Sequence, residues 1–210
     1  MSAAMVKILL AYLLGSLSGS LLIGRLRQVD IRTLGSGNAG GTNALRTQGW
    51  RFALGVVLID IGKGALAAGW IPRLPLPAHA PVPEALILVC GLAAVVGHCL
   101  PAWHGFRGGK GAATTIGVLA VVNPLLLLPM VFCWLLVVVI SGYVGLATVL
   151  AGFALLPAAW WLQASPLQMT FLGAVAVLMA WNHRANFRRM RAGRENRFER
   201  ARLRHWLRRR

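Results

Sequence analysis

The sequence predicts an all-α polytopic membrane protein with about seven transmembrane helices, and three observations support this fold class. The chain is 57% hydrophobic and only 13% charged, whereas an average soluble domain carries about 25% charged residues. Its apolar residues gather into seven segments, and its positive charges lie mainly between and after them. We therefore expect residues 1–197 to form one membrane domain, followed by a basic tail at 198–210.

The seven segments are close to the ~20 apolar residues that a helix needs to cross a bilayer, except for the short fourth one. They lie at about 5–25, 52–71, 84–100, 112–122, 124–141, 143–162 and 166–183. Only Asn123 and Pro124, a turn signal, separate the fourth from the fifth. An alternative count joins these two and gives six spans, which would place the tail opposite Arg107 and Lys110.

The basic residues predict the orientation, because cytoplasmic loops carry an excess of Lys and Arg. Five of them flank or lie within the first connection, namely Arg25, Arg27, Arg32, Arg46 and Arg51. Arg107 and Lys110 lie in the third connection, and twelve arginines follow Trp181. The connection at 72–83 has Arg73 alone. We expect the N-terminus outside and the C-terminus in the cytoplasm.

The net charge of +17 could indicate nucleic acid, but a basic block after a hydrophobic segment is typical of a topology signal and of contact with anionic lipid. We expect no nucleic-acid partner and a contact with the anionic inner leaflet. Leu203, Trp206 and Leu207 stand at i, i+3 and i+4 among arginines, which is typical of a helix lying in the membrane interface. A disordered basic end is the alternative.

Acidic and metal-binding residues are scarce. The complete set of acids is Asp30, Asp60, Glu84, Glu195 and Glu199. The three cysteines show no metal-ligand spacing, so we expect no metal and no cofactor. Asp60 and Lys63, three residues apart in the second span, are predicted to form a structural ion pair. His98 and His104 are predicted to lack an acid that could orient them.

The first connection contains a candidate phosphate site, which we call the first glycine-rich loop (residues 35–43). It reads Gly35, Ser36, Gly37, Asn38, Ala39, Gly40, Gly41, Thr42 and Asn43, and Arg46 follows. Four glycines let backbone N–H groups converge on an anion without obstruction by Cβ atoms. The planar guanidinium of Arg46 suits phosphate. A flexible turn is the alternative.

The third connection contains the second glycine-rich loop (residues 106–111), which reads Phe106, Arg107, Gly108, Gly109, Lys110 and Gly111. It runs directly into an apolar helix, so free N–H groups and the positive end of a helix dipole are expected beside Lys110. It is not a Walker A loop, because the spaced glycine and the following Ser or Thr are missing. The alternative is that Arg107 and Lys110 are only topology charges.

A third motif follows the last span. His183 and Asn186 are three residues apart and would share a face of a continuing helix, and Glu195 could orient a basic residue of the site. A solvated helix end is the alternative.

Together these motifs resemble a known family. The stretches GSGNAGGTNALR, GHCLPAWHGFRGGKGAAT and HRANFRRMRAGRENR, in this order, are similar to those of the bacterial acyl-phosphate:glycerol-3-phosphate acyltransferases (the PlsY family). The similarity runs from about residue 12 to residue 197. Three separate motifs make it far more specific than one. Gly41 stands where alanine is usual in the family, and Gly145 where serine is common.

The resemblance implies a seven-helix enzyme of the bacterial inner membrane with its active site facing the cytoplasm. Such an enzyme transfers a fatty acyl group from acyl phosphate to the 1-hydroxyl of glycerol 3-phosphate, giving lysophosphatidic acid and phosphate. It implies catalytic roles for Ser36, Arg46, Lys110, His183 and Asn186. Substrate binding is implied for the remaining motif residues: Gly35, Gly37, Asn38, Gly40, Gly41, Thr42, Asn43, Gly108, Gly109, Gly111, Thr148 and Glu195. Thr148 is expected in the inner turn between the fifth and sixth spans.

A rival interpretation is a transporter of a phosphorylated metabolite, since polar glycine-rich segments and short helices also suit that class. A transporter should show charges near the middle of the bilayer and an internal repeat, whereas here the charged motifs cluster at one predicted face. The sequence has no H-x₄-D pair, the signature of acyl-CoA-dependent glycerophosphate acyltransferases. We therefore expect a substrate phosphate to accept the hydroxyl proton.

Overall fold

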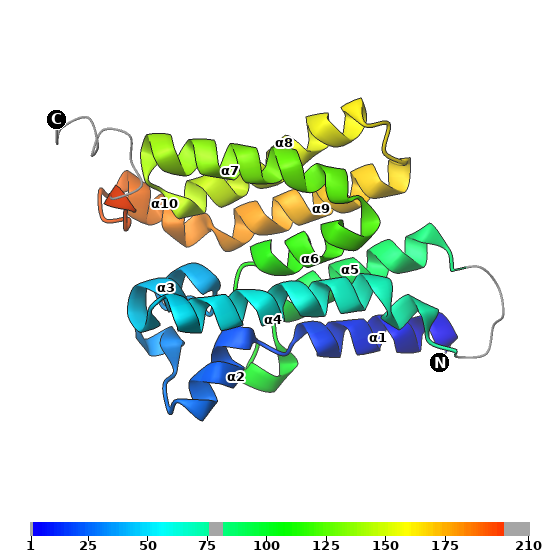
Figure 1. The fold of residues 1–210 in the computed structure, drawn as a ribbon, viewed down its shortest axis with the longest axis horizontal. Coiled ribbons are helices and arrows are strands. Elements are labelled where there is room, and N and C mark those ends of the chain that lie inside the picture. Colours follow the sequence, from blue (N-terminus) through cyan, green and yellow to red (C-terminus); the bar gives the residue numbers. More distant parts are fainter. Residues whose placement is uncertain (1, 76–81, 200–210) are drawn as a thin grey trace. The chain divides into compact units, whose positions relative to one another are not determined.

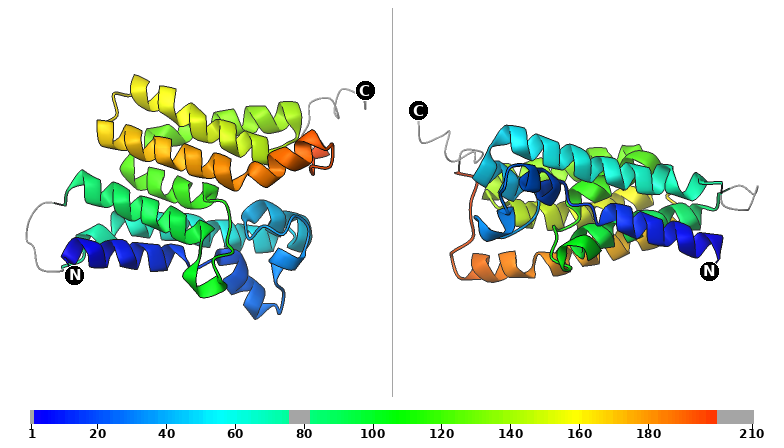
Figure 2. Two further views of the ribbon diagram at one scale, coloured as in Figure 1. Left: turned by 180° about the vertical axis from the view of Figure 1, so that it is seen from behind. Right: turned by 90° about the horizontal axis from the view of Figure 1, so that it is seen from below.

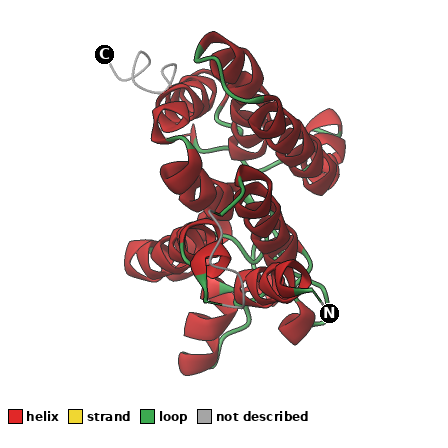
Figure 3. Ribbon diagram, turned by 90° about the vertical axis from the view of Figure 1, so that its right-hand side faces the viewer, coloured by secondary structure: helices red, strands yellow, loops and turns green. Residues whose placement is uncertain are grey.

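The computed structural model describes residues 2–75 and 82–199, and all regular structure in these ranges is helical (Figure 3). The chain divides into two compact units, Met1–Pro124 and Leu125–Arg210. The α-helices, labelled in Figure 1, are α1 (Ala3–Gly15), α2 (Gly19–Leu26), α3 (Gly41–Gln48), α4 (Trp50–Gly69), α5 (Glu84–Cys99), α6 (Ala112–Val122), α7 (Leu127–Ser141), α8 (Val144–Trp161), α9 (Pro166–Asn182) and α10 (Arg184–Arg191). Short 3-10 turns lie at Ile31–Thr33, Ile71–Arg73, Ala102–His104 and Pro124–Leu126.

The first unit is built around α4, which contacts α1, α2, α3, α5 and α6. Small residues allow the closest of these approaches. A Cβ atom on Gly64 of α4 would collide with the backbone of Thr114, and one on Gly117 of α6 would collide with the carbonyl of Ile61. Close packing of backbones through small residues is typical of helices in membranes. The predicted apolar segments therefore pack as helices against one another.

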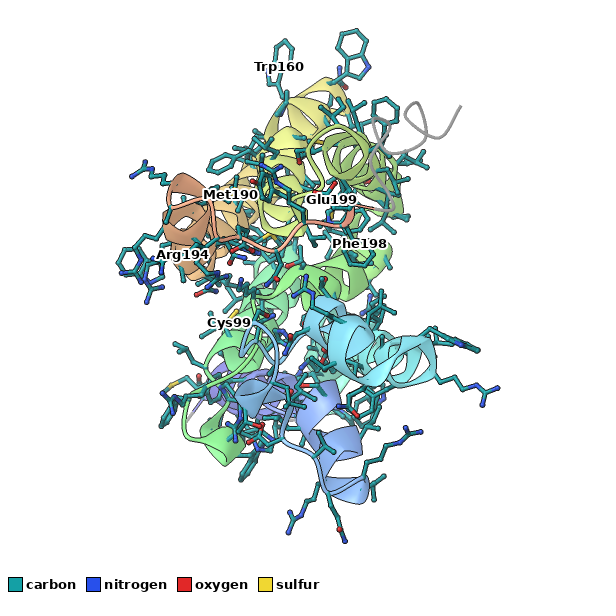
Figure 4. The ribbon with its side chains drawn as sticks, turned by 90° about the vertical axis from the view of Figure 1, so that its left-hand side faces the viewer. Cys99, Trp160, Met190, Arg194, Phe198 and Glu199 are labelled. Carbon is teal, nitrogen blue, oxygen red and sulfur yellow. The ribbon has the colours of Figure 1, made fainter. Side chains whose placement is uncertain are left out.

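The second unit contains α7, α8, α9 and α10. Helix α8 packs against α7, α9 and α10. Trp160 and Trp161 are 73% and 79% exposed at the end of α8, and Trp160 projects away from the ribbon (Figure 4). Exposed tryptophans at the end of an apolar helix are typical of the membrane–water interface.

The apolar segments agree with the helices to within a few residues. Four helical stretches are long and apolar enough to cross a membrane: Trp50–Arg73, Glu84–His104, Pro124–Ser141 and Val144–Trp161. The pair α1 and α2 could form a fifth span, and α6 and α9 are shorter apolar helices. The chain is therefore an all-helical integral membrane protein, and the count of seven spans stays a prediction.

Two features of the helices differ from the interpretations based on the sequence. The single long helix on which the six-span alternative rests is not observed, because α6 ends at Val122 and Asn123 leaves the helical conformation at φ −159° and ψ 86°. The first segment, predicted as one span, is broken between Gly15 and Gly19, where α1 and α2 meet at a bend of 48°. Ser16 and Ser18 in this break are fully buried, whereas Leu17 between them is 38% exposed. The predicted interfacial stripe at Leu203, Trp206 and Leu207 lies outside the described residues.

Candidate active site

The side chain of Asn43 fastens the start of the first glycine-rich loop, and Ser20 Oγ donates to the carbonyl of Ala39 at 3.0 Å further along it. Asn43 Oδ1 accepts a hydrogen bond from the backbone N–H of Ser36 at 2.9 Å, and its Nδ2 donates to the carbonyls of Ile31 and Leu34 at 3.0 Å each. Asn43 is 1% exposed. Both amide protons are used within the chain, so Asn43 positions Ser36 instead of offering its amide protons to a substrate.

The prediction that the N–H groups of this loop converge on an anion needs correction. Gly35 and Gly37 have the left-handed conformation expected of glycine, with φ of +57° and +71°. However, the N–H of Ser36 binds Asn43, and the N–H of Gly37 donates to the carbonyl of Leu34 at 3.0 Å. The first N–H groups of α3, which begins at Gly41, have no acceptor within the helix. The N–H groups of Ser36 and Gly37 are therefore used within the chain, and only the end of the loop that forms the first turn of α3 keeps the predicted role.

Ser36 and Arg46 are the side chains that this arrangement presents. Arg46 follows Asn43 by three residues on α3, so the two share one face of the helix. Arg46 is exposed. Within residues 2–75 and 82–199, neither the Ser36 hydroxyl nor the Arg46 guanidinium has a hydrogen-bond or ion-pair partner. A hydroxyl before α3 and a cation in the last turn of α3 are thus available.

Arg32 ties the first connection to the second glycine-rich loop. Its guanidinium pairs with Asp30 at 2.7 Å and donates to the carbonyls of His104 at 3.1 Å and Arg107 at 3.4 Å. The hydrogen bonds from Arg32 lower the pKa of the Asp30 carboxyl, so this pair stays charged at neutral pH. The α5–α6 connection accordingly lies beside α2 at one end of the first unit (Figure 2). Two glycine-rich loops therefore share that end.

The second glycine-rich loop is pinned to the end of α5 through its main chain. The N–H groups of Gly108 and Gly109 donate to the carbonyls of Cys99 and His98 at 3.2 and 3.0 Å. These two glycines therefore anchor the loop, and their N–H groups are not the ones that would bind substrate. The expectation for Gly108 and Gly109 changes from direct contact to support.

Lys110 lies directly after this anchor and directly before α6. Gly111 is the N-cap of α6 with φ of +93°, a conformation that glycine adopts at little cost. No acidic residue occurs in the first turn of α6, so the positive end of the helix dipole is not offset there. The half-buried Lys110 therefore lies next to the positive end of the α6 dipole, and the anion site predicted here from the sequence stays a prediction.

The third motif belongs to the second unit. The predicted continuous helix is wrong, because α9 ends at Asn182 and α10 begins at Arg184, with His183 between them at φ −98° and ψ 3°. His183 and Asn186 are nevertheless both buried, at 4% and 6% exposure. His183 Nδ1 lies 2.7 Å from the carbonyl of Met179. A carbonyl only accepts, so Nδ1 carries the proton and Nε2 is the acceptor nitrogen.

Glu195 orients this motif, as predicted. Its carboxylate accepts hydrogen bonds from Asn186 Nδ2 at 2.7 Å and from Arg189 Nε at 2.6 Å. The Glu195 side chain is only 7% exposed. Gly145 allows Asn186 to lie close to α8, since a Cβ atom there would come within 3.0 Å of Asn186 Nδ2. The basic end of α10 is therefore folded around one buried carboxylate.

Thr148 is placed differently from the prediction. It lies on α8 and not in the turn before it, and its hydroxyl donates to the carbonyl of Val144 at 2.9 Å while accepting from Trp134 Nε1 at 3.2 Å. These bonds occupy its proton and one lone pair, so Thr148 fastens α7 to α8. Among the described residues, no group of three His, Cys, Asp or Glu side chains is placed to hold a metal ion.

We expect Asn43→Ala to reduce both activity and stability. The substitution leaves the Ser36 N–H and two carbonyls without partners, and each such group costs about 1–3 kcal/mol when buried. Turnover per folded enzyme should fall at least tenfold, because Ser36 loses its fixed position. This loss corresponds to a rise in the activation free energy of about the same size as the cost of one unpaired group. Thr47→Val, which removes one hydroxyl on the same helix, is the control. Equal turnover and thermal midpoints for the two variants would contradict the role of Asn43.

These features define the class of protein: an integral helical membrane protein with cationic glycine-rich loops at one end of its first unit. A family model described as glycerol-3-phosphate acyltransferase matches residues 5–193. A glycerol-3-phosphate acyltransferase of Chlorobaculum tepidum is 40% identical, with 90% of this chain and 94% of the relative covered. One of Agrobacterium fabrum is 38% identical, with 90% and 89% covered.

Two solved structures have the same fold. Both are of PlsY (YgiH), an integral membrane glycerol 3-phosphate acyltransferase, and each match covers 94% of this chain and 96% of that chain. The glycerol 3-phosphate form has a TM-score of 0.84 at 32% identity, and the lysophosphatidic acid form 0.82 at 31%. This chain belongs to the glycerol-3-phosphate acyltransferase (PlsY) family.

Proposed function

We propose that this protein is an enzyme that transfers a fatty acyl group from acyl phosphate to the 1-hydroxyl of glycerol 3-phosphate. The products are lysophosphatidic acid and inorganic phosphate, and the reaction is the first step of phospholipid synthesis. The family match carries this proposal, because residues 5–193 take in both glycine-rich loops and the start of the third motif. The relatives named above are glycerol-3-phosphate acyltransferases.

The chemistry of the site agrees with two phosphate-bearing substrates. Arg46 offers a planar fork without an acidic partner among the described residues, and Lys110 stands at the start of α6. Backbone N–H groups at helix N-termini favour anions. Acyl phosphate is already activated, since phosphate is a good leaving group. The enzyme needs to orient two anions, and a strong nucleophile of its own is not required.

In the proposed step, the 1-hydroxyl oxygen of glycerol 3-phosphate attacks the acyl carbonyl carbon. The carbonyl oxygen gains negative charge, and Ser36 and Lys110 stabilise it together with the departing phosphate. The bond between the acyl carbon and the phosphate oxygen then breaks, so an ester and a phosphate form. The hydroxyl proton goes to a substrate phosphate. Catalytic roles for His183 and Asn186 are carried over from the family motif that they match.

The histidines of the described chain do not form the acid–base pair of acyl-CoA-dependent enzymes. His183 Nδ1 binds the carbonyl of Met179 at 2.7 Å. His98 does lie 3.4 Å from Asp60, so the prediction that it lacks a nearby acid was wrong. However, both residues are buried in the spans and bound to Lys63. A phosphate of the substrate is the better candidate for the proton acceptor.

The same proposal includes the placement in the membrane. We place seven spans in the bacterial inner membrane, with the N-terminus outside and the C-terminus inside. Both glycine-rich loops and the arginines after Trp181 would then face the cytoplasm, as the distribution of basic residues favours. The acyl chain would enter from the bilayer between helices.

We expect the purified protein to use acyl phosphate and not acyl-CoA as its donor. It lacks the H-x₄-D pair, and no side chain described here is arranged to activate the hydroxyl for attack on a thioester. The measurement compares initial rates of lysophosphatidic acid formation with the two donors at equal acyl chain length and detergent concentration. Transfer from acyl-CoA at a rate comparable to that from acyl phosphate would contradict the proposal.

A further inference from the structure

Three ionisable side chains meet in the interior of the first unit, and the reaction proposed above does not use them. Asp60 and Lys63 of α4 and His98 of α5 are 1%, 4% and 3% exposed. Lys63 Nζ lies 2.8 Å from Asp60 Oδ1 and 2.8 Å from His98 Nδ1. Buried charges are costly, and they persist where they are paired and fully hydrogen-bonded. We call these three residues the buried triad.

The hydrogen bonds of Lys63 indicate which nitrogen of the His98 imidazole carries a proton. An ammonium group has three protons and no acceptor, and Lys63 Nζ has three neighbours: Asp60 Oδ1, His98 Nδ1 and the carbonyl of Leu17 at 2.7 Å. Beside a charged Lys63, His98 Nδ1 therefore accepts a hydrogen bond from Nζ and carries no proton of its own. The proton of the neutral ring is on Nε2.

The buried triad also holds the break in the first span. Asp60 Oδ1 accepts from the N–H of Gly19, the first residue of α2, at 3.2 Å, and Lys63 donates to Leu17 within the break. One carboxylate and one ammonium thus satisfy backbone groups that an unbroken helix would satisfy by itself. The position of α4 is coupled in this way to the α1–α2 bend.

The other edge of the His98 ring supports the second glycine-rich loop. A Cβ atom on Gly109 would collide with the ring, and Nε2 is the nearest ring atom. The carbonyl of the same histidine accepts the N–H of Gly109 at 3.0 Å. The backbone of Gly109 therefore rests directly on the imidazole, one residue before Lys110. Cys99, the next residue of α5 (Figure 4), accepts the N–H of Gly108.

We propose that Asp60, Lys63 and His98 are positioning residues for Lys110. Asp60 and Lys63 hold the His98 imidazole in one orientation and one tautomer. The ring in turn fixes the position of the Gly109 backbone, and thereby the position of the Lys110 ammonium group. This inference rests on the proposed function, because Lys110 is assigned there to the reacting phosphate. The ion pair between Asp60 and Lys63 predicted from the sequence is present, and this inference gives it a second role.

The first test is His98→Asn. The asparagine Oδ1 can still accept from Lys63, so the charges stay satisfied, but the ring atoms under Gly109 are gone. A displacement of about 1 Å at a reacting group can reduce the rate by about a hundredfold. We expect kcat to fall about ten- to a hundredfold while the thermal midpoint in detergent stays close to that of the wild type. A merely structural role would lower the midpoint and leave the turnover of the folded fraction unchanged.

A compensating pair makes the test sharper. Gly109 does not have a positive φ, so alanine there is opposed by the ring and not by the backbone. Gly109→Ala alone should be severely impaired, and Gly109→Ala combined with His98→Asn should regain several-fold in kcat, because the Cβ atom fills the space left by the ring. Additive losses in this double-mutant cycle would contradict direct packing of the ring on the loop.

A second variant serves if His98→Asn does not fold. Asp60→Asn with Lys63→Met removes both charges together, so no lone charge is left buried, and it removes the donor to His98. Its kcat should fall about tenfold or more by the same displacement argument. The matched control is Lys7→Met, since Lys7 is another buried lysine of the first unit, 7% exposed, that donates to a carbonyl, that of Pro72. The control should keep its kcat.

The outcomes separate this inference from the proposed function. Wild-type protein that makes no lysophosphatidic acid from acyl phosphate would overturn the proposed function, and this inference with it. Active wild-type protein whose His98→Asn and Asp60→Asn/Lys63→Met variants match Lys7→Met in kcat would overturn this inference alone. Reduced kcat at an unchanged thermal midpoint, with recovery in the double variant, would support it.

Discussion

Lys110→Ala should reduce kcat by two to three orders of magnitude, which is the largest single effect we expect. Removing one preorganised electrostatic donor from an active site costs about 3–4 kcal/mol of transition-state stabilisation. Lys110 stands between the anchored glycines and the N-terminus of α6, so no neighbouring side chain can take its place without moving the loop. The measurement is the initial rate of lysophosphatidic acid formation by folded protein in detergent.

The control for this variant is Arg107→Ala. Arg107 lies on the same loop and its side chain is exposed, and the hydrogen bond to Arg32 uses its carbonyl, which alanine retains. If Arg107→Ala lowered kcat as much as Lys110→Ala, the effect would reflect general positive charge. Near-wild-type turnover of a folded Lys110→Ala variant would refute the phosphate role of Lys110.

Arg46→Lys should fail almost as completely as Arg46→Ala, in spite of its retained charge. A guanidinium offers parallel N–H groups that bind phosphate in a bidentate manner, whereas an ammonium is a single point charge. Arg46 has no partner among the described residues, so its fork is available to a substrate. We expect a loss of about 2–3 kcal/mol, or roughly thirty- to more than a hundredfold in kcat/KM, for a charge-assisted contact.

Arg51→Lys is the matched control for this substitution. Arg51 is exposed near the same connection, and its guanidinium lies over the Trp50 ring at 5.4 Å. It should retain wild-type kcat/KM. Full activity of Arg46→Lys would show that charge alone is needed at this position and would contradict bidentate phosphate binding.

The sequence predicted the helices well, because both hydrophobicity and its interruptions are local signals. The apolar segment at 112–122 coincides with α6, and Asn123 with Pro124 ends it as predicted. The break between Gly15 and Gly19 could not be predicted in the same way. It is stabilised by Asp60 and Lys63, more than forty residues away, and a local pattern contains no information about such contacts.

The sequence predicted candidate site residues, but the hydrogen-bonding roles of several of them depend on the fold. Composition pointed to glycines, Arg46 and Lys110, but it could not show that Asn43 uses its amide to fasten Ser36. Similarly, Gly108 and Gly109 support the loop through hydrogen bonds to the end of α5. Which N–H groups stay available for an anion depends on the acceptors that the fold brings to the others, and the residue pattern does not show these pairings.

His98 is the residue whose environment was misjudged. Its neighbours along the chain contain no acid, yet α4 brings Asp60 to 3.4 Å from its Nδ1. One signal could have indicated this, namely that an ionisable residue within a span needs a polar partner. Two such residues, Asp60 and Lys63, already lay in the neighbouring predicted span.

The central claim is that this protein joins an acyl group from acyl phosphate to glycerol 3-phosphate at one site, without a second compartment. The most direct measurement is the simultaneous quantification of lysophosphatidic acid and inorganic phosphate formed by the purified protein in detergent micelles. The account predicts that both appear at equal initial rates, that both depend on both substrates, and that Lys110→Ala loses both. Failure to form lysophosphatidic acid in micelles, with movement of glycerol 3-phosphate or phosphate across vesicle membranes containing the same protein, would contradict the claim and identify a transporter.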